Sequence, residues 1–212
     1  PQVLPKVMQG ITTELLGQDG VSMAPLPTQY ISPWRKNLAG LDGDTDEIDW
    51  TYETTDNYLK MIEKAHPGLN EMYLVPHGNI RMEAMGLDNR LPTDEEIEKV
   101  KAITRREMEA GAMGLSTGLI YIPCAYSESK EIIEMCKVVA EYDGVFVIHQ
   151  RSEADTILDS MKEVIEIGRK SGVMVHWSHF KVCGKQNWDK IDAVLELLEE
   201  AKKEGITVSF DQ

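Results

Sequence analysis

The chain has 212 residues, of which 42% are hydrophobic and 27% are charged, a composition typical of a globular protein with room for one sizeable core. Its formal net charge of -14 argues against a nucleic-acid or anionic-membrane partner, because both select basic surfaces, and no apolar run is long enough to span a bilayer. Three cysteines without a CxxC pair indicate a reduced compartment, so we predict a cytoplasmic protein.

The first part of the chain shows two strand patterns separated by a long irregular stretch. An apolar, β-branched run that ends at a glycine predicts a strand over 11–17. The proline-containing, acidic stretch over 25–53 predicts a loop insertion. Apolar residues at helical spacing then predict a helix over 55–66, and the run over 71–76 predicts the next strand.

The rest of the chain alternates helices and strands more regularly. Thr93 and Glu96 form a capping-box pattern, which predicts a helix that starts there and extends to about residue 110. The elements expected after it are a strand at 113–118, a helix at 128–142, a strand at 145–149, a helix at 154–170, a strand at 173–177, a helix at 188–204 and a strand at 206–210.

This alternation predicts the α/β class, with a parallel sheet and helices outside it. A complete α/β barrel has eight strand–helix units in about 250 residues, so six units fit a barrel without its first and last strands. The chain does not begin with Met and both ends look cut, which leads us to expect an internal segment of a longer protein. The alternative is an open doubly wound sheet, but the glycine-rich GxGxxG loop usual in that fold is absent after the first strand.

Two histidines, His149 and His179, follow apolar runs at places where strands are expected to end. In an α/β barrel the chemistry lies at the C-terminal ends of the strands, and imidazole is the commonest protein nitrogen ligand for zinc. Side chains alternate along a strand, so Val145, Val147 and His149 are expected on the same face of the first of these strands. On the next strand, one face is expected to carry Val173, Val175, Trp177 and His179. If both faces point inward, the two imidazoles converge into a metal site; the alternative is two structural histidines satisfied by hydrogen bonds.

For three further residues, a role in the site has to be weighed against a purely structural role. Asp19 lies in GQDG after the first predicted strand, where it is either a metal ligand or a turn residue between glycines. His176 has the opposite parity to His179 and is expected to face the helix layer as a structural residue. His77 directly follows the strand at 71–76 and either supports the site or is structural.

Segments taken from the whole length of the chain carry a family resemblance. These are KVMQGITTELLGQDGVSMAPL, GAMGLSTGLIYIP, HQRSE, SHFKVCGKQNW and the final VSFDQ. Together and in this order they resemble the N-acyl-D-amino-acid deacylases (D-aminoacylases) of the amidohydrolase superfamily. The resemblance implies an amidohydrolase TIM barrel, of which residues 1–212 would be a partial catalytic domain with strands two to seven. The first and last barrel strands and a small β domain would be absent from it.

The resemblance also implies a reaction and a metal. The enzyme would hydrolyse the amide bond of a small N-acyl-D-amino acid, with one or two zinc ions as cofactor. His149 and His179 would be the metal ligands of strands five and six. Asp19 falls where many family members have a bridging cysteine, so this departure leaves the number of metal ions open.

Other implied roles concern the substrate and the proton transfers. Tyr121 and Lys181 match family positions that contact the substrate carboxylate or the reacting amide, and Arg151 matches the family's HxRxE pattern among the substrate-binding residues. An HxH motif is expected before Pro1 and the general acid/base aspartate beyond Gln212. The segment alone is therefore expected to be inactive.

Two other interpretations stay open at this point. A cyclic-amide amidohydrolase of the hydantoinase or dihydroorotase type would share the barrel and the ligands. It would be favoured by a lysine for carboxylation in the fourth barrel strand, and the segment MGLSTG has none. The other interpretation is a non-catalytic barrel that has lost its metal. The sequence leaves the acyl group, the amino acid and the oligomeric state undetermined.

Overall fold

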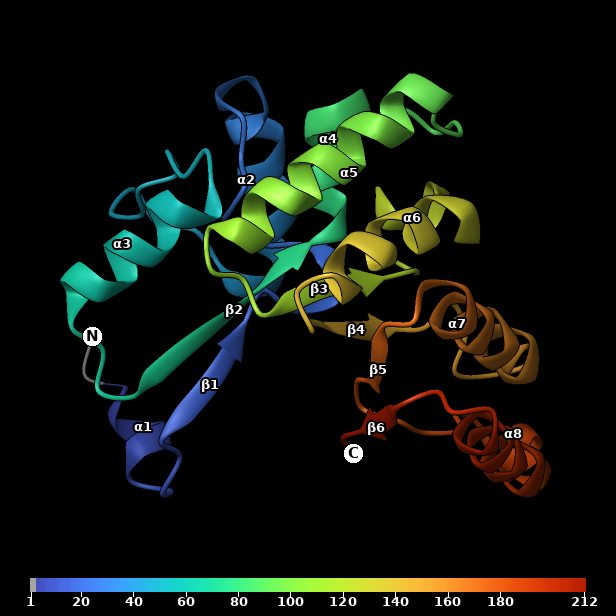
Figure 1. The fold of residues 1–212 in the computed structure, drawn as a ribbon. Coiled ribbons are helices and arrows are strands. Elements are labelled where there is room, and N and C mark those ends of the chain that lie inside the picture. Colours follow the sequence, from blue (N-terminus) through green and yellow to red (C-terminus); the bar gives the residue numbers. More distant parts are fainter. Residues whose placement is uncertain (1–2) are drawn as a thin grey trace.

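A computed structural model describes residues 3–212, and within this range six parallel strands form one curled sheet in chain order (Figure 1). The strands are β1 (Thr13–Leu16), β2 (Asn70–Pro76), β3 (Gly114–Gly118), β4 (Val145–His149), β5 (Met174–Trp177) and β6 (Val208–Phe210). Each strand pairs in parallel with the next. The predicted α/β class is thus confirmed. The strand order lacks the reversal that defines an open doubly wound sheet.

The first helix precedes β1, and the others lie in the connections between successive strands, several of them packed on the outside of the curl. They are α1 (Leu4–Val7), α2 (Ile31–Asp42), α3 (Thr55–Ala65), α4 (His77–Met85), α5 (Asp94–Glu109), α6 (Ser129–Ala140), α7 (Ile157–Ser171) and α8 (Ile191–Lys203). Short 3-10 turns are η1 (Gln18–Gly20), η2 (Thr28–Tyr30), η3 (Cys124–Tyr126) and η4 (Lys185–Lys190). Figure 1 shows α5, α6, α7 and α8 following one another along one side of the sheet. None of the helices in residues 3–212 is both long and apolar enough to cross a membrane.

The prediction of a loop over 25–53 was wrong, because this stretch contains the helix α2. Trp34 and Leu38, four residues apart on α2, are both buried. They pack in one cluster with Leu26, Trp50 and Met82, which lie outside the helix. The apolar face of α2 is therefore completed by residues distant in sequence, which local helical spacing does not reveal.

The capping box that predicted the start of α5 is present. The Thr93 side chain accepts a hydrogen bond from the Glu96 backbone N–H at 3.2 Å, and the Glu96 carboxylate accepts one from the Thr93 N–H at 2.8 Å. Arg90 donates two hydrogen bonds to the same carboxylate, at 2.6 and 2.7 Å. These bonds lower the pKa of Glu96 to about 2, so its charge also complements the N-terminal end of the helix dipole.

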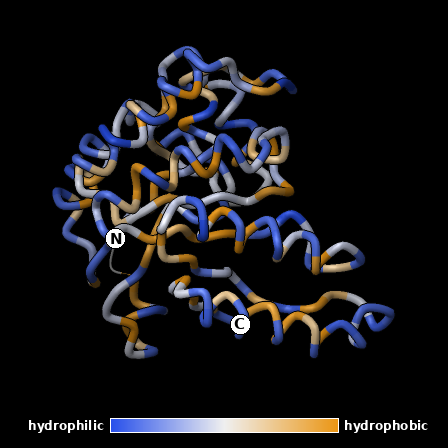
Figure 2. Tube along the Cα trace, turned by 45° about the vertical axis from the view of Figure 1, so that its right-hand side comes forward, coloured by the Kyte–Doolittle hydropathy of each residue, from blue (hydrophilic) through white to orange (hydrophobic). Residues whose placement is uncertain are grey.

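The main core lies between the sheet and its outer helices. Phe146 and Ile148 of β4 and Val175 and Trp177 of β5 are fully or almost fully buried in this core. Figure 2 shows the corresponding pattern, with hydrophobic segments turned inward and hydrophilic ones outward along the helices. Since neighbours along a strand point to opposite faces, Val147 points to the other, concave face of the sheet, as predicted.

The same pattern corrects the prediction for β5. Val175 and Trp177 were expected on the face that carries the site, yet they pack in the helix-side core. His176 was expected against the helices and instead faces the concave side, where its Nδ1 lies 2.8 Å from the Ser209 Oγ of β6. Parity along β5 therefore does not explain where His179 lies.

Candidate metal centre

Asp19, His149 and His179 come together at the C-terminal ends of their strands. One ligand atom from each side chain lies within 4.8 Å of one from each of the others. The Nδ1 atom of His149 is 2.9 Å from the Nε2 atom of His179. The expected convergence of the two imidazoles is confirmed. Asp19, which follows β1 at the other side of the sheet, lies with them. Metal binding by these residues stays a prediction.

Asp19 reaches this position through a tight turn after β1. Its backbone is left-handed, with φ of 59°. The buried Ser116 hydroxyl donates to the Gly17 carbonyl at 2.5 Å and accepts from the Gly20 N–H at 3.0 Å. A Cβ on Gly118 would lie 2.5 Å from the Asp19 carbonyl oxygen, which is too close for any other residue. Ser116 and Gly118 of β3 thus bring the turn across the ends of the central strands.

Because Ser116 bonds to both sides of this turn, we expect Ser116→Ala to weaken zinc binding. The buried Gly20 N–H and the part-buried Gly17 carbonyl would lose their partner, each at a cost of up to about 1–3 kcal/mol. Zinc affinity, measured by chelator competition, is expected to fall about 10–100-fold, as for other supports of metal ligands. The matched control is Ser171→Ala, which removes a hydroxyl bonded to the Ile167 carbonyl and the Val173 N–H at the far end of α7. Equal zinc affinity in the two variants would contradict this role.

His179 is placed by its backbone beyond the end of β5. Its φ of 40° is left-handed and turns the chain out of the strand alternation. The Asp211 carboxylate accepts a hydrogen bond from the His179 N–H. The Asp211 backbone also bonds to both flanks, accepting from the Phe180 N–H at 2.8 Å and donating to the Trp177 carbonyl at 3.1 Å. These hydrogen bonds with Asp211 hold the backbone so that the His179 imidazole points toward His149.

His149 is suited to act as a neutral ligand. It is the last residue of β4, and only 8% of its surface is exposed. Burial lowers its pKa, although the nearby Glu153 and Asp19 charges oppose this effect. A lowered pKa favours the unprotonated imidazole, which is the form that binds a metal.

Of the three predicted substrate-binding residues, Tyr121 and Lys181 lie beside this cluster. The Tyr121 ring is 5.3 Å from the His149 ring, centroid to centroid. Burial and the Asp19 and Glu153 charges raise the Tyr121 pKa, consistent with its place next to them. Lys181 is exposed, and its Nζ lies 2.7 Å from Glu153 Oε1.

Arg151 has a different set of partners. Its guanidinium pairs with Glu163 of α7 at 3.0 Å. It also donates to the carbonyls of Ala125 at 3.3 Å and Ser127 at 3.0 Å. These contacts join α7 to the segment before α6. None of the hydrogen bonds described for Arg151 is to Asp19, His149 or His179.

Glu153 is a site residue that the sequence analysis did not single out. It lies in the loop after β4, and its Oε1 atom is 2.8 Å from His179 Nδ1 and 2.7 Å from Lys181 Nζ. The available signal was its place four residues after His149, in the same loop as Arg151. Nothing in that spacing shows that this loop meets the one after β5.

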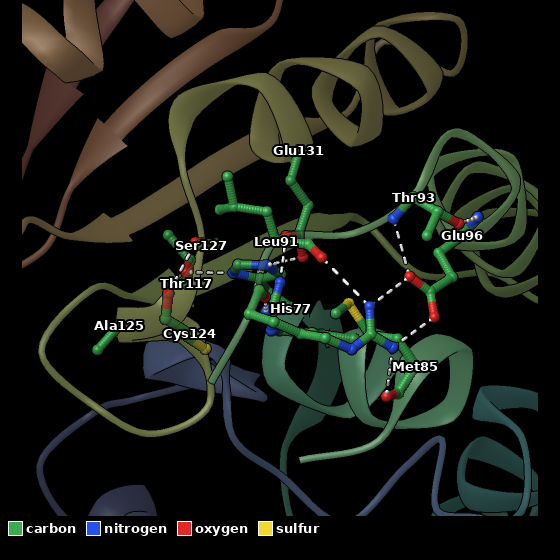
Figure 3. Close-up of polar contacts among 12 residues, drawn as sticks. His77, Met85, Leu91, Thr93, Glu96, Thr117, Cys124, Ala125, Ser127 and Glu131 are labelled. Atoms are coloured by element: carbon green, nitrogen blue, oxygen red, sulfur yellow. Dashed lines mark hydrogen bonds and ion pairs between the residues drawn. The ribbon is translucent and has the colours of Figure 1, made fainter. Parts of the chain in front are cut away.

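His77 belongs to a buried ionic network on the helix side of the sheet (Figure 3). Its Nδ1 lies 2.8 Å from Thr117 Oγ1 and its Nε2 lies 3.0 Å from Glu131 Oε1. The Arg81 guanidinium forms an ion pair with the other oxygen of Glu131. Burial opposes a charge on His77, but Cys124 and Glu131 outweigh it and raise the pKa to about 9. The hydrogen bonds described for His77 fill both ring nitrogens, and neither is to Asp19, His149 or His179.

The donor set of the candidate centre fits zinc. Catalytic zinc sites typically use three protein ligands drawn from imidazole nitrogens, carboxylate oxygens and thiolates. Asp19, His149 and His179 supply two nitrogens and one oxygen, in part buried. Zinc-bound water needs an open coordination position, which three protein ligands would leave.

The comparisons with known proteins agree with the sequence resemblance. No family model matches the chain. A D-aminoacylase of Alcaligenes xylosoxydans xylosoxydans is 34% identical over 197 residues, which cover 93% of this chain and 40% of that protein. The crystal structure of N-acyl-D-glutamate deacylase from Bordetella bronchiseptica, complexed with zinc and a phosphonate mimic of the tetrahedral intermediate, matches with a TM-score of 0.89 and 33% identity. That match covers 100% of this chain and 43% of the other.

A second solved structure concerns the binuclear metal centre of D-aminoacylase, with one-metal activation and second-metal attenuation. It matches with a TM-score of 0.86 and 33% identity, covering 98% of this chain and 42% of the other. The chain thus spans about 40% of the length of the relatives it matches. Over that span, the curled sheet matches part of an amidohydrolase barrel.

Proposed function

From the homology of this chain to the N-acyl-D-amino-acid deacylases of the amidohydrolase superfamily, we propose that it forms part of a zinc-dependent hydrolase. The enzyme cleaves the amide bond of N-acyl-D-amino acids to a carboxylate and a free D-amino acid. The observation that carries this proposal is the meeting of Asp19, His149 and His179 at the strand ends. The six strands correspond, in this proposal, to barrel strands two to seven.

The chain's own residues would bind the metal and the substrate. Asp19, His149 and His179 would hold zinc. When bound, zinc polarises an acyl carbonyl and lowers the pKa of its water to about 7. Lys181 and Tyr121 would hold the amino-acid end of the substrate in place, which is a positioning role. We assign Arg151 to holding the segment 124–127 rather than to the substrate, because its hydrogen bonds run to Glu163 and to that segment.

The remaining groups needed for turnover would come from the part of the relatives' length that this chain does not span. The resemblance implies further histidine ligands from the first barrel strand and a general acid/base aspartate after the last strand. The aspartate would take a proton from water and return it to the leaving amine. Activity is therefore proposed for the intact enzyme and not for this segment.

Lys181→Ala is expected to raise KM for N-acyl-D-amino acids without loss of zinc. The change removes a charge-assisted hydrogen bond to the substrate carboxylate, worth about 1.5–3 kcal/mol, which corresponds to about 10–150-fold in KM. Steady-state kinetics and zinc analysis of the same preparation check both parts. Lys185→Ala, an exposed lysine in the following turn, is the matched control. Zinc loss in Lys181→Ala would make Lys181 part of the metal centre instead.

The function itself is tested with a substrate panel on the intact enzyme. Zinc-loaded protein is expected to release D-amino acids from N-acetyl-D-amino acids and to leave the L-isomers largely intact. Removing the metal with a chelator should abolish this activity, and added zinc should restore it. Hydrolysis of a hydantoin or dihydroorotate in place of the linear amides would favour the cyclic-amide alternative. Failure to bind zinc at all would favour a non-catalytic barrel.

A further inference from the structure

Glu153 ties together the two loops that carry His149 and His179. Its backbone carbonyl accepts a hydrogen bond from the Cys183 N–H at 2.7 Å, which joins the loop after β4 to the loop after β5. Its side chain is only 15% exposed. One carboxylate oxygen, Oε1, lies within hydrogen-bond distance of both His179 Nδ1 and Lys181 Nζ. The position is thus fixed by backbone and side chain together.

The first consequence concerns the tautomer of His179. Its Nε2 faces His149 Nδ1 at 2.9 Å, so Nε2 is the nitrogen available to a shared ion. A neutral imidazole that binds a metal through Nε2 carries its proton on Nδ1, and this N–H needs an acceptor. Glu153 Oε1 lies 2.8 Å away and can accept it. Lys181 Nζ is also near Nδ1, at 2.9 Å, but an ammonium can only donate.

The second consequence concerns Lys181. Its ammonium has three N–H donors. One is directed to Glu153 Oε1 at 2.7 Å and one to the His179 carbonyl at 2.9 Å. Once His179 Nδ1 carries a proton, the third donor of Lys181 has no partner among these three groups. That donor is free for an anionic group of a bound molecule.

We propose that Glu153 is a positioning residue that serves both halves of the site. It fixes the Nδ1–H tautomer and the orientation of His179 toward zinc, and it aims Lys181 so that one donor is left for the substrate carboxylate. This inference rests on the proposed function and deepens it. It links metal binding and recognition of the anionic end of the substrate through a single oxygen atom.

Zinc affinity of the intact protein tests the first half. Glu153→Ala is expected to raise the zinc Kd about 10–100-fold, the usual effect of losing a group that orients a histidine ligand. Glu153→Gln keeps an oxygen that can accept the Nδ1–H, so it should recover most of the affinity. The visible spectrum of the cobalt-substituted protein should change in the alanine variant and return toward wild type in the glutamine variant. Glu166→Gln, at a half-buried carboxylate of α7 paired with Arg169 and Lys170, is the matched control.

A double-mutant cycle at saturating zinc tests the second half. KM for an N-acyl-D-amino acid should rise in Glu153→Ala and in Lys181→Ala, and the double variant should be little worse than Lys181→Ala alone. Additive effects on KM, or a Glu153→Ala protein with wild-type zinc affinity, would overturn the inference. A wild-type protein that binds no zinc or hydrolyses no N-acyl-D-amino acid would instead overturn the proposed function, so the two failures are distinguishable.

Discussion

Asp19→Ala is expected to lose zinc and hydrolytic activity together. Asp19 is one of only three potential ligands in the described cluster. Its removal should therefore lower zinc affinity by more than the about 10–100-fold expected for removing a residue that only orients a ligand. Asp19→Cys should retain zinc, because a thiolate is a good zinc ligand, and it should bind zinc more selectively than the harder carboxylate. Zinc content per protein and kcat/KM measured on the same samples check both expectations.

Two controls separate ligation from a role in the turn. Asp19 has φ of 59°, a conformation that asparagine also tolerates, so Asp19→Asn preserves the turn while removing the charge. Asp159→Ala removes an exposed aspartate on α7, whose side chain is 82% exposed. Full zinc content and full rate in Asp19→Ala would reduce Asp19 to a turn residue between two glycines.

The largest effect on stability is expected from Glu131→Ala. This change removes the carboxylate partner of the Arg81 guanidinium, which is 0% exposed, and one of the two groups, with Cys124, that favour a charge on buried His77. Breaking a buried ion pair by removing one partner typically costs about 3–5 kcal/mol. Denaturant unfolding of the intact protein measures this cost. Glu134→Ala, also on α6 but paired with Lys137 at the surface, should cost well under half as much. Equal costs would show that the network contributes no special stability.

The same network predicts a dependence of stability on pH. The folded-state pKa of His77, about 9, lies above its ordinary value of 6.5. Protonated His77 therefore stabilises the fold fully below about pH 6.5, and this contribution is lost as the pH rises through about 9. The free energy of unfolding should fall between these values, and the fall should be smaller in His77→Gln. An identical pH profile in His77→Gln would contradict this origin.

The sequence was sufficient for features that depend on local pattern. Strand–helix alternation predicted the α/β class, and the Thr93–Glu96 pair predicted the start of α5. The placement of His149 and Asp19 at strand ends predicted the cluster, because the C-terminal ends of parallel strands meet at one edge of a curled sheet. Predicting these features requires only the spacing of apolar residues and the identity of the residues at the ends of each helix or strand.

The features missed by the sequence depend on contacts between distant segments. The helix α2 packs Trp34 against Trp50 and Met82, so its apolar face is visible only once these meet. His179 was expected to follow the alternation of β5, whereas a left-handed backbone beyond the strand sets its direction. Glu153 gains its role only where the loops after β4 and β5 lie together.

Whether Asp19, His149 and His179 hold the zinc ion used in amide hydrolysis is tested most directly by a crystal structure of the zinc-loaded, active protein with anomalous data at the zinc edge. The expected result is a zinc peak bonded at about 2.0–2.2 Å to a carboxylate oxygen of Asp19 and one nitrogen from each histidine. A zinc ion bound elsewhere in an active enzyme, with these three side chains unligated, would contradict this assignment.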